Sequence, residues 1–164
     1  MAQILFKNCH LLDNKNQTLQ PGYWVLINDN LIQEVSQKEI IAEGATIIDL
    51  KNKTLMPGLI DAHVHVTATD LDLANDYIPD SEITVQAARF MEDMLMRGFT
   101  SIRDAGGADI GLSNAVKKAL IKGPRLFYSG KAISQTGGHG DFRKATSKES
   151  IFDCTCADAD PLYC

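Results

Sequence analysis

Short apolar runs separated by turn-forming residues occupy the first third of the chain. The runs are Ile4–Phe6, Tyr23–Ile27 and Thr46–Leu50. The second run is followed by Asn-Asp-Asn at 28–30, which is typical of a turn, so Leu31–Val35 is predicted as the return strand of a hairpin. Short strands joined by turns indicate a small sheet or half of a β-sandwich, and residues 1–56 are therefore predicted to form a β-segment.

Beyond Pro57 and Gly58 the pattern changes to apolar strands that alternate with stretches of helical spacing. Strands are predicted at 59–66, 99–103 and 125–133, and helices at 80–98 and 109–122. Asp80 and Ser81 predict the N-cap of the first helix. The buried stripes are predicted to be Ile83, Ala87, Phe90, Met91, Met94 and Leu95 on the first helix, and Ile110, Ala115, Ala119 and Leu120 on the second.

This β-α-β-α-β order predicts an α/β fold with a parallel sheet, because parallel strands need crossover connections that helices supply. The pattern alone leaves two architectures open, an open sheet wound on both sides and a closed barrel. A glycine-rich loop follows at 135–141, and the β/α region ends near 143. Residues 144–164 show no periodicity and are predicted to form an irregular tail.

The strand predicted at 59–66 carries the clearest candidate chemistry. Side chains alternate along a strand, so Asp61, His63 and His65 are predicted to share one face, opposite the apolar residues Ile60, Ala62, Val64 and Val66. They lie toward the C-terminal end of the strand, where α/β sheets and barrels place their active sites. Two imidazoles at this spacing can bind one divalent metal, and we favour that reading over two buried core histidines.

Four further polar residues have both a structural and a functional interpretation. His139 lies between glycines in the 135–141 loop, where substrate contact and a plain loop position are equally favoured. Arg103 and Asp104 end the second β/α strand, and an ion pair between them is favoured over a role in a pocket. His10 lies in the β-segment and is interpreted as an ordinary sheet histidine.

The composition is that of a globular protein. The chain has 164 residues, of which 45% are hydrophobic and 23% are charged, and its formal net charge is −5. These values exclude a disordered tail, and the negative charge argues against a nucleic-acid partner bound through bulk positive charge.

Targeting and cysteine content predict a cytoplasmic protein. No apolar run approaches the roughly 20 residues that span a bilayer, so no membrane association is predicted. No secretory signal pattern is present at the N-terminus either. The cysteines, Cys9, Cys154, Cys156 and Cys164, crowd toward the C-terminus instead of spreading as a disulfide framework would.

Several motifs carry a family resemblance. The segment LMPGLIDAHVH at 55–65 resembles the signature of the amidohydrolase superfamily, and TSIRDAGG at 100–107 and GPR at 123–125 fit the same family. The segment SQTGGHGD at 134–141 is similar to the branch that contains imidazolonepropionase-like enzymes and metal-dependent Xaa-Pro-type dipeptidases. Together these matches cover residues 1 to about 143.

The resemblance implies a β-sandwich beside a (β/α)₈ barrel. Residues 1–56 would supply the N-terminal part of the sandwich, and 57–143 would be the first three β/α units of an incomplete metal-dependent hydrolase barrel. It also implies one or two divalent metal ions, usually zinc, with His63 and His65 as ligands. Asp61 would orient these two histidines without binding the metal itself. His139 and Arg103 would contact the substrate, a dipeptide or cyclic amide whose C–N bond is hydrolysed by metal-activated water.

No complete catalytic set is predicted in this chain. A full barrel needs eight units in roughly 250 residues, and the family's remaining ligands belong to later strands. The chain is therefore expected to be a truncated amidohydrolase that is inactive alone and self-associates through exposed sheet edges. The alternatives are a non-catalytic α/β fragment that binds a metal or a partner, and an inert or frame-shifted remnant.

Overall fold

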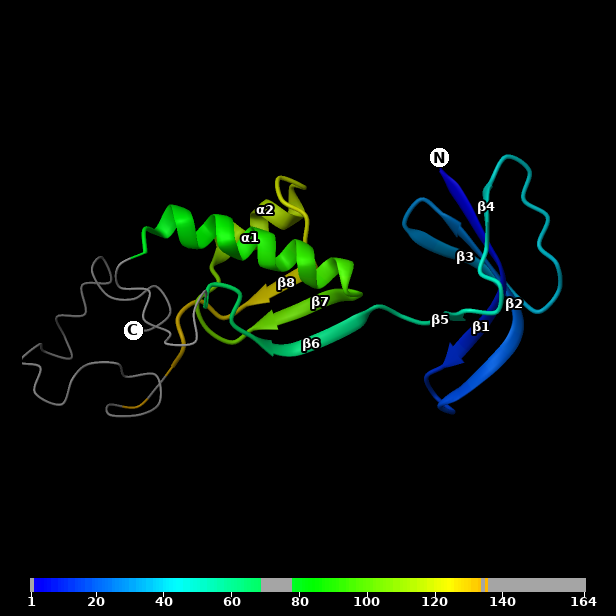
Figure 1. Cartoon of the computed structure of the whole chain (residues 1–164), viewed down its shortest axis with the longest axis horizontal. Helices are drawn as coiled ribbons and strands as arrows, with labels where there is room; N and C mark the ends of the chain where they lie inside the picture. Colours follow the sequence, from blue (N-terminus) through cyan, green and yellow to red (C-terminus); the bar gives the residue numbers. More distant parts are fainter. Residues whose placement is uncertain (1, 69–77, 134, 136–164) are drawn as a thin grey trace, which may run out of the picture. The chain divides into compact units, whose positions relative to one another are not determined.

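The computed structural model describes residues 2–68, 78–133 and 135 (Figure 1). The chain divides into two compact units, Met1–Pro57 and Gly58–Cys164. Within the described residues, no helix combines the length and the apolar character needed to cross a membrane.

Unit 1 is a β-sheet whose strand order is β3-β2-β1-β4, with β5 paired to β1 (Figure 1). Its strands are β1 (Gln3–Asp13), β2 (Thr18–Asn28), β3 (Leu31–Ser36), β4 (Thr46–Asp49) and β5 (Thr54–Leu55). The pairs β1–β2 and β2–β3 are antiparallel, whereas β4 and β5 run parallel to β1. The predicted hairpin between β2 and β3 is confirmed, and Asp29 in its turn has a φ of 54°, a conformation that aspartate tolerates.

The core of unit 1 is small. Leu5 and Leu26 from β1 and β2 pack with Ile40, and Trp24 lies against them. Cys9 is buried with no exposed surface, and its Sγ donates a hydrogen bond to the carbonyl of Tyr23 at 3.2 Å.

Unit 2 contains a parallel three-stranded sheet with the order β6-β7-β8. Its elements in chain order are β6 (Leu59–Val64), α1 (Asp80–Met96), β7 (Phe99–Asp104), α2 (Ile110–Lys117) and β8 (Arg125–Tyr128). Both helices connect successive parallel strands, so the predicted α/β class is confirmed.

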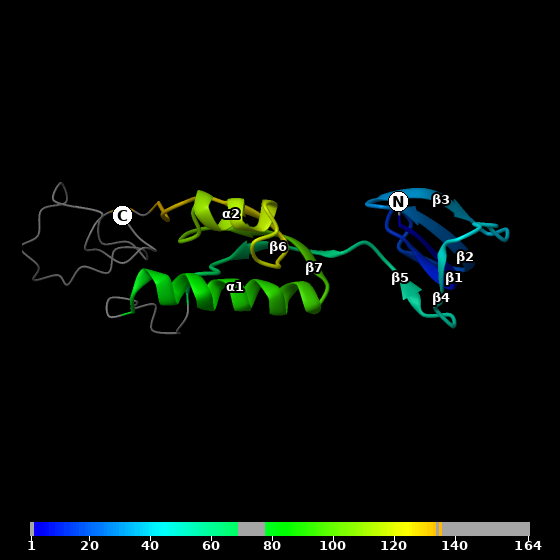
Figure 2. The same ribbon diagram turned by 90° about the horizontal axis from the view of Figure 1, so that it is seen from above.

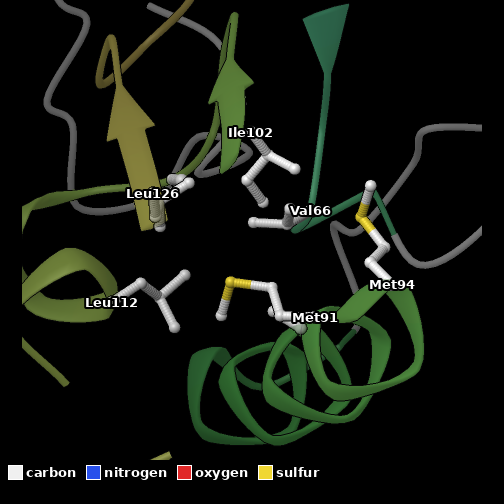
Figure 3. Packing of buried hydrophobic residues seen from close by; sticks show 8 residues of the cluster. Val66, Met91, Met94, Ile102, Leu112 and Leu126 are labelled. Atoms are coloured by element: carbon white, nitrogen blue, oxygen red, sulfur yellow. The ribbon is translucent and has the colours of Figure 1, made fainter. Parts of the chain in front are cut away.

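One hydrophobic core joins both helices to the same face of this sheet. Figure 2 shows α1 and α2 side by side, and Figure 3 shows Met91 of α1 and Leu112 of α2 directed toward Ile102 and Leu126 of the strands. Val66, which follows β6, completes the contact. Because these residues come from every layer, they fix the C-terminal ends of the strands relative to the helices.

The stripe predicted for α1 is mostly confirmed. Ile83, Ala87, Met91 and Met94 are buried. Phe90 is 43% exposed, which contradicts its predicted place on the stripe, and the Arg97 guanidinium lies 5.9 Å from the centre of its ring. The predicted N-cap is also wrong, because Pro79 occupies that position and Asp80 already lies in the first turn.

The second helix differs more from its prediction. It ends at Lys117, and Ala119 has a left-handed φ of 55°. The predicted stripe is wrong: Ile110 and Leu120 are exposed, whereas Leu112 and Ser113 are buried. Ser113 is buried because its hydroxyl donates to the carbonyl of Leu126 at 3.1 Å, a tertiary contact that hydropathy does not encode.

Two predicted strands end early. The strand predicted at 59–66 ends at Val64, and the one predicted at 125–133 ends at Tyr128, just before Gly130 with its φ of 77°. The glycine-rich loop with His139, except for Gln135, and the tail at 144–164 lie outside the described residues.

Candidate metal centre

The candidate site begins where β6 ends. The pairing of β6 with β7 shifts register between Leu59 and Ile60 and again between Asp61 and Val64. The pairing with β7 is therefore irregular where the predicted site residues lie, and the common face of Asp61, His63 and His65 stays a prediction. His63 lies within β6, and His65 follows its last residue.

The structure brings the two predicted imidazoles together. The ring centres of His63 and His65 are 5.2 Å apart, and the ring planes meet at 75° in an edge-to-face arrangement. His63 is exposed and His65 is half-buried. Two imidazoles at this distance can turn one nitrogen each toward a shared cation.

A hydrogen bond sets which nitrogen His65 can offer. Its Nδ1 lies 2.9 Å from the carbonyl oxygen of Gly106. A carbonyl oxygen only accepts, so Nδ1 carries the proton in the neutral ring and Nε2 keeps its lone pair. Metal-binding histidines commonly donate their second nitrogen to a backbone carbonyl in this way.

Asp61 contacts the backbone of the pair. Its Oδ1 accepts a hydrogen bond from the N–H of His63 at 3.1 Å. This bond spans two residues inside the region of shifted register, so the carboxylate supports the local backbone that carries His63.

Arg103 and Asp104 do not form the predicted ion pair. They are neighbours on β7, so their side chains leave opposite faces of the strand. Arg103 is exposed, and its Nε donates to the carbonyl of Ala62 in β6 at 2.7 Å. Asp104 has no exposed surface and accepts backbone hydrogen bonds instead.

Asp104 is the residue at this end of the sheet whose role the sequence did not reveal. Its Oδ2 accepts from the N–H of Val66 at 2.7 Å, and its Oδ1 accepts from those of Gly106 and Ala108 at 3.0 and 3.1 Å. It thus joins the residue after His65 to the turn after β7. An aspartate that ends a strand and is followed by Ala-Gly-Gly is the signal that could have indicated this.

Of the other predicted residues, one lies elsewhere in the chain and one outside the described part. His10 is in β1 of unit 1, where its backbone N–H bonds the carbonyl of Lys53 at 3.0 Å. His139 lies outside the described residues. Among residues 2–68, 78–133 and 135, no three His, Cys, Asp or Glu side chains cluster closely enough to hold a metal ion. The donor set described here is thus the two imidazoles, which suits a borderline cation such as zinc but fills only part of its coordination.

Known structures resemble this chain over nearly its full length. A prolidase complexed with N-methylphosphonate-L-proline is 39% identical, with a TM-score of 0.89 over 99% of this chain and 40% of that protein. A crystal structure of an amidohydrolase is 44% identical, with the same TM-score and the same coverage of both chains. The ochratoxinase of Aspergillus niger is 39% identical over 92 residues, which are 53% of this chain and 19% of that enzyme.

The chain thus spans about two fifths of the length of these two solved proteins and about a fifth of the ochratoxinase. The sequence profile of the amidohydrolase family matches residues 54–159, which include His63, His65 and all of β6, β7 and β8. The predicted resemblance is confirmed, and the chain belongs to the amidohydrolase family.

Proposed function

We propose that this chain supplies the first two metal ligands of a hydrolase that cleaves C–N bonds. In this proposal β6, β7 and β8 are the first three strands of a (β/α)₈ barrel, and residues 1–56 are the N-terminal part of a β-sandwich. The observation that carries the proposal is the paired arrangement of His63 and His65, with the Nδ1 of His65 committed to the Gly106 carbonyl.

The roles of the residues follow from their contacts. His63 and His65 hold a divalent cation, for which zinc fits the imidazole donors best. When bound, such a cation would act as a Lewis acid that activates water and polarises the carbonyl group of the substrate amide. Asp61 holds the backbone of His63 in place through its 3.1 Å hydrogen bond.

The substrate in this proposal is a small amide, either a dipeptide or a cyclic amide. The likeness to a prolidase seen with a proline phosphonate favours a dipeptide that ends in proline. Arg103, exposed beside β6, would pair through its guanidinium with the substrate carboxylate. His139 would be a second substrate contact.

Zinc titration of the purified chain tests the metal site. Thiolates also bind zinc, so the titration uses a background with Cys154→Ser, Cys156→Ser and Cys164→Ser. Calorimetry should give one zinc per chain, and His63→Asn or His65→Asn should weaken binding at least tenfold, about the loss that follows damage to a zinc site.

His10→Asn is the matched control, because His10 lies in unit 1 and should leave the affinity unchanged. If zinc binding survives the double variant His63→Asn/His65→Asn, the metal is held elsewhere and the proposal is wrong.

A further inference from the structure

We propose that Asp104 is a positioning residue for the metal site, which acts on His65 through the carbonyl group of Gly106. The inference rests on the proposed function for both the presence and the identity of the bound cation. The contacts that carry it lie entirely within unit 2.

The first step is the way in which Asp104 divides its two oxygens. Oδ2 faces the chain after β6 and accepts from Val66, while Oδ1 faces the turn after β7 and accepts from Gly106 and Ala108. The side chain is fully buried, so water does not compete for these bonds. A buried carboxylate that accepts several N–H groups holds both segments in one geometry.

The second step leads from the turn to the imidazole. Gly106 donates its N–H to Asp104 and offers its carbonyl to Nδ1 of His65. The same residue therefore joins the carboxylate to the ring. A displaced carbonyl would free Nδ1, and the neutral ring could then place its proton on Nε2, the nitrogen that a cation needs.

The turn is also held from its other side. Gly107, with a φ of 112°, donates its N–H to the carbonyl of Gly130 at 2.8 Å. A Cβ added to Gly106 would lie 2.7 Å from the Cβ of Ala132. The turn that carries the Gly106 carbonyl is thus held on both sides. If the turn moves, the hydrogen bond between this carbonyl and Nδ1 of His65 is lost.

An amide cannot replace this carboxylate. Asparagine has one acceptor oxygen and one NH₂ group, so in Asp104→Asn either the Val66 side or the Gly106 side meets a donor facing a donor. The variant nearly keeps the volume of the side chain, so it removes one acceptor and the charge without leaving a cavity.

The matched control is Asp109→Asn. Asp109 caps α2 by accepting from the N–H of Leu112 at 3.0 Å, and asparagine caps helices about as well as aspartate. This change removes one carboxylate close in sequence to Asp104 and leaves the contacts of Gly106 untouched.

The experiment is long-range ¹H–¹⁵N NMR of the chain with ¹⁵N-labelled histidine, without metal and at about pH 8, where ordinary imidazoles are neutral. Assignment comes from His65→Asn. The wild type and Asp109→Asn should show His65 as the Nδ1–H tautomer, and Asp104→Asn should show a mixture of both tautomers. An unchanged tautomer in folded Asp104→Asn would overturn the proposal, because a purely structural role would not move this signal.

A second route avoids dependence on one variant. Gly106→Ala pushes the turn away from Ala132 while Asp104 stays in place, and it should also give mixed tautomers. Adding Ala132→Gly removes the colliding Cβ and should restore the Nδ1–H form at least in part. If Gly106→Ala keeps the wild-type tautomer, the carbonyl does not control the ring and the proposal fails.

Zinc affinity separates this inference from the proposed function. If the site binds zinc, Asp104→Asn should weaken binding about 10- to 100-fold and Asp109→Asn should not. If the wild type binds no zinc while the tautomer changes as expected, the positioning role stands and the proposed metal site is wrong.

Discussion

Aspartate carboxylates that accept backbone N–H groups organise the turns of this chain. Asp13 accepts from Lys15 and Asn16 in the turn after β1, and Asp104 accepts from three backbone groups in unit 2. The difference is exposure, because Asp13 is partly open to water whereas Asp104 is fully buried. We therefore expect Asp13 to tune the stability of one turn and Asp104 to fix a site.

The stabilising effect of Asp13 should depend on pH. Hydrogen bonds from the side chain and backbone of Asn16, and from the backbone of Lys15, lower the pKa of Asp13 below its ordinary value of 3.8. The folded state thus holds the proton less tightly than the unfolded state, so the contribution is present above the ordinary value and is lost as the pH falls through the lowered pKa. Near neutral pH the free energy of unfolding of the wild type should therefore exceed that of Asp13→Asn. This difference between the two proteins should shrink as the pH falls.

Urea unfolding across that pH range, followed by the fluorescence of Trp24 in unit 1, measures the gap. Asp49 offers a parallel test, because the N–H of Lys51 and the amide of Asn8 also lower its pKa. A gap between wild type and Asp13→Asn that stays constant down to acid pH would contradict this account.

At the scale of elements, the two helices differ in how they pack on the sheet of unit 2. α1 buries four residues at helical spacing and exposes most of the others, so it covers the sheet with a single stripe. α2 is shorter and is held partly by the Ser113 hydroxyl. The strand ends that carry the candidate site depend on this packing, since Val66, two residues after β6, belongs to the same core.

Two methionines of α1 should therefore respond very differently to truncation. Met91 has no exposed surface, and Met91→Ala should lower the free energy of unfolding by about 2–5 kcal/mol through lost contacts and a cavity. Met96 is 80% exposed, and Met96→Ala should change it by no more than about 0.5 kcal/mol. Helical circular dichroism in urea reports on unit 2, which contains both described helices. Equal effects of the two substitutions would show that the described core is wrong.

At the scale of the whole molecule, each unit has its own core. Leu5 and Leu26 anchor one, and Met91 and Ile102 anchor the other. In unit 2 the strands β6 and β8 are the edges of the described three-stranded sheet, and they expose Ile60 and Phe127. Self-association through such edges stays a prediction.

Any zinc-dependent hydrolysis by the purified chain should depend on both histidines of the candidate site. The described residues bring these two imidazoles together, and a catalytic zinc is held through such side chains. Assays of proline dipeptides and cyclic amides with added zinc should therefore show no activity in the His63→Asn/His65→Asn variant. Zinc-dependent hydrolysis that survives in this variant would show that the two histidines do not hold the catalytic metal.

Sequence patterns predicted the two histidines better than the residues that hold the surrounding strands and helices in place. The His-x-His spacing predicted two neighbouring imidazoles, and the rings do lie 5.2 Å apart. The interpretation of Arg103 and Asp104 as an ion pair was wrong, because opposite charges in sequence suggest attraction while strand geometry separates neighbours. The predicted stripe of α2 failed for a similar reason, since Ser113 is buried by a tertiary hydrogen bond.

The sequence by itself determined the alternation of strands and helices, the hairpin of unit 1 and the family, because periodicity and motifs are local properties. Only the tertiary structure showed that the Asp104 carboxylate reaches Val66, 38 residues earlier, and that Gly106 holds His65 across 41 residues. These contacts join segments that meet only when β6 and β7 pair side by side. A buried acceptor takes whatever donors the fold brings to it, so its partners cannot be read from the residues around it.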